Sequence, residues 1–189
     1  VATGGLSLPK TGASPVGYRI AERFNIPVTP VRAGLVPLTL DKPVLEITGK
    51  LSGIAVPVSV STQEGITFTE QLLFTHRGLS GPVILQISNY WKPGSSIYIE
   101  LRPGVDVEPL LIAEQQENPN RNIRTILSKY LPKALVDALA ALQLVSDMAL
   151  NGMTVEKRRE LVKNLKGWQL KPNGTEGWRT AEVTIGGVD

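Results

Sequence analysis

The chain has 189 residues, of which 42% are hydrophobic and 20% charged, and its formal net charge is +3. This composition is typical of a globular protein with one good core or two small ones. The absence of cysteine and the single histidine exclude disulfides, thiolate sites and clustered-histidine metal sites, so we expect no metal and a reducing, cytoplasmic location. No apolar run approaches the ~20 residues of a membrane span. The small positive charge does not by itself indicate a nucleic-acid partner.

The first 30 residues predict the edge of a ligand-binding layer. Residues 1–5, Val-Ala-Thr-Gly-Gly, are typical of a strand that runs into a Gly-Gly turn, where a ligand can approach the backbone closely. Ser14-Pro15 then predicts the start of a helix that continues to Phe24 and stops before Pro27. The chain opens inside a motif and without an initiator methionine, so we expect further residues before Val1.

Residues 31–105 predict a β-rich region. Apolar residues alternate with other residues over 54–60 and again over 66–74, which indicates two strands joined as a hairpin. Pro57 indicates an edge position for the first of these strands, because proline cannot donate to a sheet ladder. A further short strand is predicted over 97–101.

The stretch 72–91 predicts a strand, a tight glycine-containing turn and a buried helix. Ser80 precedes a Gly-Pro pair, so we expect its hydroxyl to cap the helix that follows over 83–91. His76 and Arg77 lie beside the free amides of this helix start, and together they predict a site for an anion or a carbonyl oxygen. The alternative interpretation is structural, because a lone histidine often only completes a turn.

Residues 106–167 predict helices, of which the last covers 155–166 and is capped by Thr154. The outer face of this helix carries basic residues that resemble a nucleic-acid footprint, namely Lys157, Arg158, Arg159 and Lys163. Glu156 and Glu160 interrupt that cluster, and it contains no aromatic residue. A solvated helix face is therefore the preferred interpretation, and we expect no nucleic-acid partner.

The C-terminal residues return to a β pattern. A strand is predicted over 168–172 and another over 181–185, and the second runs into Gly186-Gly187-Val188. The chain therefore ends as it begins, with a strand that leads into a glycine pair. Both ends are typical of one nucleotide-binding layer, and the residues between them are typical of an insertion into it.

Four blocks of residues carry a resemblance to a known family. The blocks are Ala2-Thr3-Gly4-Gly5 with Pro9, Gly12 and Gly17-Tyr18; Gly34 to Leu38; Phe74 to Pro82; and Gly174 to Thr184 with Gly186-Gly187-Val188. In this order, they resemble the bacterial flavoproteins known as NAD(FAD)-utilising dehydrogenases, some of which are aminoacetone oxidase-like. The resemblance covers essentially the whole chain, and Trp178 stands where the family pattern has tyrosine.

The resemblance implies an α+β fold inserted into a split FAD-binding α/β domain. A β-rich, barrel-like subdomain would cover 31–105 and 168–180, and a small helical subdomain would cover 106–167. Residues 1–30 and 181–189 would be the two edges of the FAD-binding domain. The residues implied to bind the cofactor are Ala2, Thr3, Gly4, Gly5, Gly186, Gly187 and Val188.

The resemblance also implies FAD as the cofactor, with NAD(P)H as a candidate reductant. The phosphate-binding fingerprint G-x-G-x-x-G is absent from these 189 residues and lies before the matching position of Val1 in the family. We therefore expect that the chain alone does not hold FAD and is inactive, although its full-length parent is an enzyme.

We thus expect the insert and substrate-side domain of an FAD-dependent oxidoreductase, which covers the flavin and helps to bind a small carbonyl- or amine-containing substrate. The substrate-binding candidates are His76, Arg77 and Ser80, and no catalytic residue is assigned. The expected partners are a small-molecule substrate and the remainder of the FAD-binding domain, with no nucleic acid and no membrane. The alternative is a non-enzymatic interaction module that binds an acidic partner or nucleic acid through helix 155–166.

Overall fold

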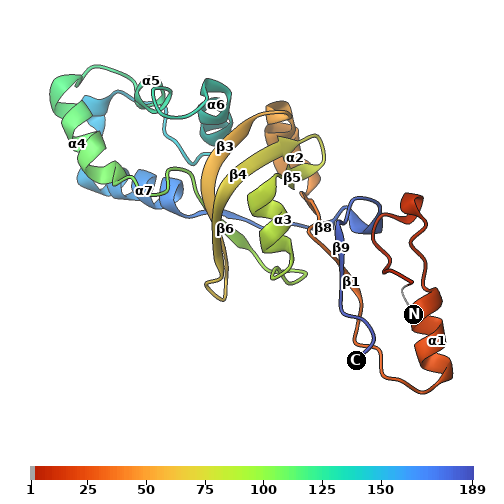
Figure 1. Cartoon of the computed structure of the whole chain (residues 1–189). Coiled ribbons are helices and arrows are strands. Elements are labelled where there is room, and N and C mark those ends of the chain that lie inside the picture. The colour runs from red at the N-terminus through yellow and green to blue at the C-terminus, as the bar shows by residue number, and fades with distance from the viewer. Residues whose placement is uncertain (1–2) are drawn as a thin grey trace.

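The computed structural model describes residues 3–189 and has an α+β architecture, as expected. The helices are α1 (Val16–Arg23), α2 (Lys42–Thr48), α3 (Pro82–Ser88), α4 (Val107–Glu117), α5 (Ile123–Leu127), α6 (Lys133–Ala141) and α7 (Val155–Lys166). The strands are β1 (Arg32–Gly34), β2 (Leu38–Thr39), β3 (Ala55–Thr62), β4 (Thr67–Thr75), β5 (Gly78–Ser80), β6 (Ile97–Glu100), β7 (Trp168–Leu170), β8 (Gly174–Thr175) and β9 (Val183–Ile185). Figure 1 shows helices α4 to α7 at one end, the main sheet in the middle and both chain ends at the other end.

The main sheet is antiparallel and curls into a barrel-like form. Its seven strands run in the order β7-β6-β3-β4-β5-β2-β8. The two edge strands, β7 and β8, are separated in the chain by only Lys171–Asn173, which can span at most ~15 Å. Phe74 of β4 also stacks on Trp168 of β7 at 6.3 Å between ring centroids, although two strands separate them in the sheet order. Both observations require a strongly curved sheet.

The hairpin of β3 and β4 forms as the period-2 pattern predicts. The apolar residues of β3 that face the core, Val56, Val58 and Val60, are buried, and so are Leu72 and Phe74 of β4. The predicted edge position of Pro57 is wrong for the strand, because β3 lies between β4 and β6. Proline is tolerated because pairing with β6 begins only at Ser59, so β4 is the only sheet neighbour of Pro57.

The predicted serine cap of the buried helix is wrong. Ser80 is the last residue of strand β5, which pairs with both β4 and β2. The residue before helix α3 is Gly81, with a φ of 87°, and it makes no side-chain cap hydrogen bond. The expected turn forms at His76 and Arg77, but a short strand follows it, in which Leu79 is fully buried between those two neighbours. The helix also ends at Ser88, before the expected end at Trp91.

Helices α4 to α7 share one continuous hydrophobic core with the barrel. The Thr154 hydroxyl oxygen accepts a hydrogen bond from the Lys157 amide at 3.3 Å, which confirms the predicted cap of α7.

Glu114 of α4 is a buried carboxylate, and the Lys129 ammonium donates a 2.6 Å hydrogen bond to it. This hydrogen bond lowers the pKa of Glu114.

Residues 3–34 and 181–189 pack together, and we refer to them as the terminal layer. In this layer β1 pairs with β9, and the Thr184 hydroxyl oxygen accepts hydrogen bonds from the amides of Leu6 (2.9 Å) and Ser7 (3.2 Å). The strand expected over residues 1–5 is not seen over Thr3–Gly5, and Val1 and Ala2 lie outside the described residues. The two chain ends therefore form one structural unit beside the barrel.

The substitution Gly81→Ala is expected to destabilise the protein strongly. A Cβ atom at Gly81 would lie 2.7 Å from the carbonyl oxygen of Gln71 and 2.8 Å from the amide nitrogen of Leu73. Gly94 has the same φ of 87° but no atom within 4 Å of a Cβ, so Gly94→Ala carries only the backbone strain. We expect Gly81→Ala to lower the free energy of unfolding by about 1–3 kcal/mol more than Gly94→Ala, as measured by urea denaturation. Equal losses in the two variants would contradict this account.

Glu114→Gln is expected to lower the free energy of unfolding by about 1 kcal/mol at pH 7, because it weakens a charge-assisted hydrogen bond. The pKa of Glu114 is lowered from 4.5 in the folded protein, so its stabilisation is present above that pH. The stabilisation is lost as the pH falls through the lowered pKa. The difference from wild type should therefore shrink at acid pH in denaturant titrations, whereas exposed Glu117→Gln on the same helix serves as the control. A constant difference between pH 7 and pH 3 would count against this pairing.

Candidate functional site

An open hollow of about 350 Å³ lies where the barrel meets the terminal layer, and we refer to it as the Arg77 hollow. The turn between β4 and β5 contributes His76 and Arg77, and the other side comes from the short 3-10 helices Pro9–Thr11 and Gly177–Arg179 and from Thr180 after them. Its lining residues are Lys10, His76, Arg77, Glu176, Arg179 and Thr180. The hollow is thus built from three segments that lie far apart in the sequence.

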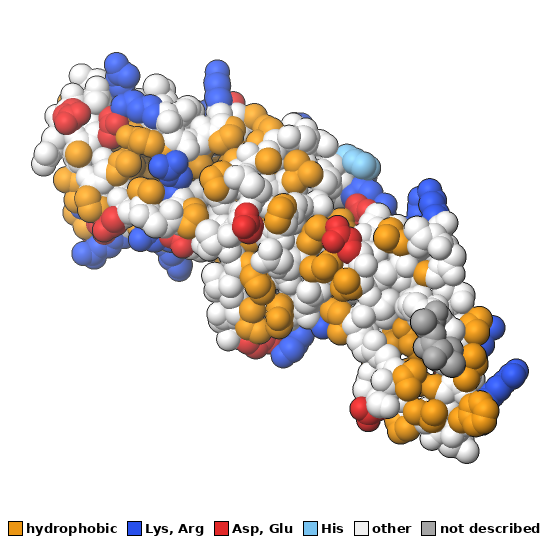
Figure 2. All heavy atoms as spheres, viewed as in Figure 1, with side chains coloured by type: hydrophobic (Ala, Val, Ile, Leu, Met, Phe, Trp, Pro, Cys, Tyr) orange, Lys and Arg blue, Asp and Glu red, His pale blue; other side chains and the backbone are white. Residues whose placement is uncertain are grey.

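The backbone of the β4–β5 turn is held firmly. The Thr75 hydroxyl oxygen accepts hydrogen bonds from the amides of Arg77 (3.2 Å) and Gly78 (3.1 Å). The carbonyl oxygen of Arg77 accepts a hydrogen bond from the Leu40 amide at 3.2 Å. The side chains of His76 and Arg77 therefore project from a fixed turn, and both residues are exposed. Figure 2 shows the single histidine, in pale blue, at the surface on the side of the barrel that faces the terminal layer.

The charges of the Arg77 hollow favour an anion or an electron-rich oxygen. Lys10, Arg77 and Arg179 face a single lining carboxylate, Glu176. The Nε atom of Arg77 lies 3.8 Å from Oε1 of Glu176, and the side chains are 53% and 13% exposed, respectively. This contact is longer than a hydrogen bond, and the half-exposed Arg77 side chain makes no hydrogen bond to the described residues, so its guanidinium donors are free to bind a ligand.

The structure brings together two of the three predicted substrate-binding residues. His76 and Arg77 line the hollow, whereas Ser80 is half-buried at the end of β5 and does not. Sequence reasoning missed Lys10 and the contributions of Glu176, Arg179 and Thr180. The last three belong to the block Gly174 to Thr184, so that motif was the available signal for them.

The residues expected to bind FAD lie in the terminal layer, except that Ala2 is outside the described residues. A Cβ atom at Gly4 or Gly187 would meet no atom within 4 Å, so the backbone at both positions faces open space. Thr3 packs instead against helix α1, where a Cβ on Gly17 would lie 2.1 Å from its hydroxyl oxygen. A ligand can therefore approach the backbone closely at Gly4 and Gly187, but the phosphate-binding fingerprint is not in this sequence.

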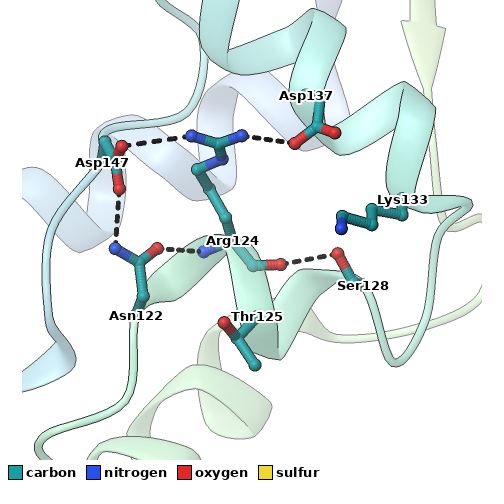
Figure 3. Close-up of a pocket in the computed structure, with 7 residues that line it drawn as sticks. All are labelled: Asn122, Arg124, Thr125, Ser128, Lys133, Asp137 and Asp147. Carbon is teal, nitrogen blue, oxygen red and sulfur yellow. Dashed lines mark hydrogen bonds and ion pairs between the residues drawn. The ribbon is translucent and has the colours of Figure 1, made fainter.

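A second hollow, of about 370 Å³, lies among the helices (Figure 3). Its centre is Arg124, whose guanidinium binds Asp137 and Asp147, the latter at 3.1 Å. Hydrogen bonding to Asp137 raises the pKa of Arg124, and hydrogen bonds from Asn122 and then Arg124 lower the pKa of Asp147. The two carboxylates thus balance the positive charges of Arg124 and the nearby Lys133. It is a weaker anion site than the Arg77 hollow, and Arg124 serves to tie α5 to its neighbours.

Two further properties bear on what the chain can bind. No group of three or more histidine, cysteine, aspartate or glutamate side chains within residues 3–189 is arranged to hold a metal ion. No helix in the same part of the chain is both long and apolar enough to cross a membrane.

Comparison with known proteins gives a family and several relatives. Residues 32–183 match the family described as HI0933-like protein barrel and H2TH domain. Two curated relatives are named ribosomal RNA dihydrouridine synthase, from Escherichia coli (strain K12) and Haemophilus influenzae, and they are 51% and 49% identical over all 189 residues. A 3-dehydro-bile acid delta(4,6)-reductase from Clostridium scindens is 25% identical over 199 aligned positions that cover the whole chain. The chain spans 47% of each of the first two relatives and 49% of the third, which is about half of their length.

These relatives correct the expectation that nucleic acid is not a partner. The first two relatives are named for action on ribosomal RNA, which overturns that expectation. The basic residues of helix 155–166 were the available sign of RNA, but its mixed charges and its lack of aromatic residues favoured a solvated helix face. None of the three relatives is named as an aminoacetone oxidase, so the finer part of the resemblance is not supported. The match over 32–183 shows that the chain belongs to the HI0933-like family, which is related to FAD-dependent flavoproteins.

Proposed function

We propose that this chain is the substrate-side part of an FAD-dependent oxidoreductase that reduces uridine in ribosomal RNA to dihydrouridine. The observation that carries the proposal is the 51% identity, over the whole chain, to a protein named ribosomal RNA dihydrouridine synthase. The positively charged Arg77 hollow supports it, because RNA offers both phosphates and base carbonyl oxygens. An RNA substrate of this kind is in keeping with a cytoplasmic location.

The chemistry of this reaction calls for a donor at a carbonyl oxygen. Reduction of uridine adds one hydride and one proton across the C5=C6 double bond of uracil, which is conjugated with the C4 carbonyl. A hydrogen-bond donor at O4 draws electrons from C6 and favours hydride addition there. Reduced flavin, when bound, would supply the hydride, with NADH or NADPH as the candidate source of electrons.

The relative from Clostridium scindens supports the same reaction class. Its name denotes a reductase of a 3-dehydro bile acid with double bonds at positions 4 and 6. That substrate shares with uracil a carbon–carbon double bond conjugated with a carbonyl group. The three relatives are thus named for two different substrates, while the bond that would be reduced lies in the same chemical setting.

In the proposed enzyme, the Arg77 hollow holds the target nucleotide. His76 and Arg77 would donate to a base carbonyl oxygen from the turn that Thr75 fixes. Lys10 and Arg179 would pair with the adjoining phosphates, and Glu176 would orient Arg77.

We further propose that the terminal layer is the edge of an FAD-binding α/β domain, split at about residues 30 and 181. Helix α1 exposes an apolar stripe at i, i+4 and i+8, with Val16, Ile20 and Phe24 exposed by 45%, 37% and 74%. A helix of a globular protein normally buries such a stripe. The other exposed large apolar residues of this layer are Leu8, Ile26, Val183 and Val188. Figure 2 shows apolar side chains, in orange, gathered at this end of the molecule.

The proposed reaction is tested with the purified full-length protein and ribosomal RNA from cells that lack the enzyme. We expect flavin absorbance in the protein and new dihydrouridine in the RNA after addition of NADH or NADPH. His76→Ala and Arg77→Ala are expected to lower kcat or raise KM by about 10²-fold, because each removes a positioned donor. Flavin content and melting temperature should stay unchanged in these variants, as in the control Lys50→Ala, which alters an exposed residue outside the hollow. Normal turnover in both hollow variants would overturn the role of this site.

The domain proposal is tested by a matched pair of substitutions in the full-length protein. Ile20 on α1 and Ile66 beside the β3–β4 hairpin are both 37% exposed in this structure. Ile20→Asp is expected to lower flavin content and melting temperature, because it places a charge in a covered interface. Ile66→Asp should leave both unchanged. If the two variants behave alike, the terminal layer is not covered by the rest of the protein.

A further inference from the structure

Helix α7 concentrates the positive charge of the chain. Its twelve residues include five basic and two acidic side chains, so its net charge equals the +3 of the whole chain. Arg158 is directed toward α4, where its Nε atom lies 3.4 Å from Oε1 of Glu108, and its side chain is only 14% exposed. That residue therefore has a structural partner, unlike the basic residues on the outer face of the helix.

The outer face of α7 carries Arg159, Lys163 and Lys166, which we call the α7 basic stripe. At i, i+4 and i+7 these residues fall within an arc of about 60° and along ~10 Å of helix. All three are exposed, and none forms an ion pair with any of the residues 3–189. The two acidic residues of the helix, Glu156 and Glu160, lie in its N-terminal half. The charged side chains of its C-terminal half are therefore the two lysines alone. Attraction to the helix dipole favours lysines in the last turn but does not account for Arg159.

The α7 basic stripe and the Arg77 hollow lie on different sides of the barrel. In Figure 1, α7 runs from the helical end of the molecule to the barrel, and the terminal layer lies on the other side of the barrel. Figure 2 shows Lys and Arg side chains, in blue, along the edge of that end. The part of the protein proposed to join the terminal layer therefore does not account for this charge.

We propose that the α7 basic stripe binds backbone phosphates of ribosomal RNA. This inference rests on the proposed function, since the relatives supply the RNA partner. Exposed lysine and arginine side chains bind phosphates without reading sequence, and such contacts set the position of the nucleic acid. The stripe thus docks the RNA, while the Arg77 hollow on the other side of the barrel holds the target base. Two separate contacts select a large folded RNA over a free nucleoside.

The test compares two double variants of the full-length protein, Lys163→Gln/Lys166→Gln and the control Lys42→Gln/Lys50→Gln. Both pairs are exposed and free of ion pairs within the described chain, so each variant loses the same charge. Affinity for deproteinised ribosomal RNA is measured between 0.05 and 0.3 M salt. Two lost phosphate contacts are expected to reduce the slope of log K against log salt by about 1.5–2. The same loss weakens binding by roughly 10-fold or more at 0.15 M salt, with kcat at saturating RNA, flavin content and melting temperature unchanged.

The outcomes separate this inference from the proposed function. If wild type forms dihydrouridine and the stripe variant keeps wild-type affinity and slope, the inference is overturned while the proposed function stands. An equal loss in the control variant also overturns the inference, since the effect then comes from net charge alone. If wild type neither binds nor reduces ribosomal RNA, both the proposed function and this inference fail.

Discussion

The arrangement of the molecule depends on the short link between the two edge strands of the main sheet. Lys171–Asn173 joins β7 to β8, so the sheet must curl until its edges come close. Strand β7 follows helix α7 directly, and β8 leads into the segment that returns to the terminal layer. The link therefore keeps the two edges of the curled sheet close together, and it also connects the helical end of the chain to the terminal layer. The stacking of Phe74 on Trp168 fills the interior of the curved sheet.

The order of the strands is also what creates the Arg77 hollow. Strand β2 pairs with β5 on one side and with β8 on the other, which brings the β4–β5 turn next to the segment after β8. Glu176 follows β8 immediately, and its amide donates a 3.0 Å hydrogen bond to the carbonyl oxygen of Pro37. Glu176 can thus lie within ion-pair distance of Arg77, although about a hundred residues separate them. The site is a property of strand order rather than of any single motif.

The sequence predicted the elements whose signal is local and repeated. Alternation over 54–60 and 66–74 located the main hairpin, and Thr154 located the start of α7. Ser80 was misplaced because a three-residue strand carries no period of its own, and pairing with two neighbours decided its conformation. Two of the six residues that line the candidate site were found, since His76 and Arg77 are adjacent in the chain. Lys10 and Glu176 join them only through the tertiary fold, which no local pattern reports.

The nucleic-acid partner was missed for a different physical reason. The basic residues of α7 are mixed with two glutamates, and in sequence this mixture is typical of a solvated helix. In the structure Arg158 turns to α4, and the outward face is left with cations toward the helix end. Relatives that contain this barrel are named for a ribosomal RNA and for a bile acid. Because the bond proposed to be reduced is alike in both substrates, the two substrates must be distinguished by contacts away from that bond. Surface charge on helix α7 can provide that distinction, because phosphates are present in one substrate and absent from a steroid skeleton. In the proposed enzyme, the chemistry would thus stay at the edge of the barrel, and the choice of substrate would be made by the surfaces around it.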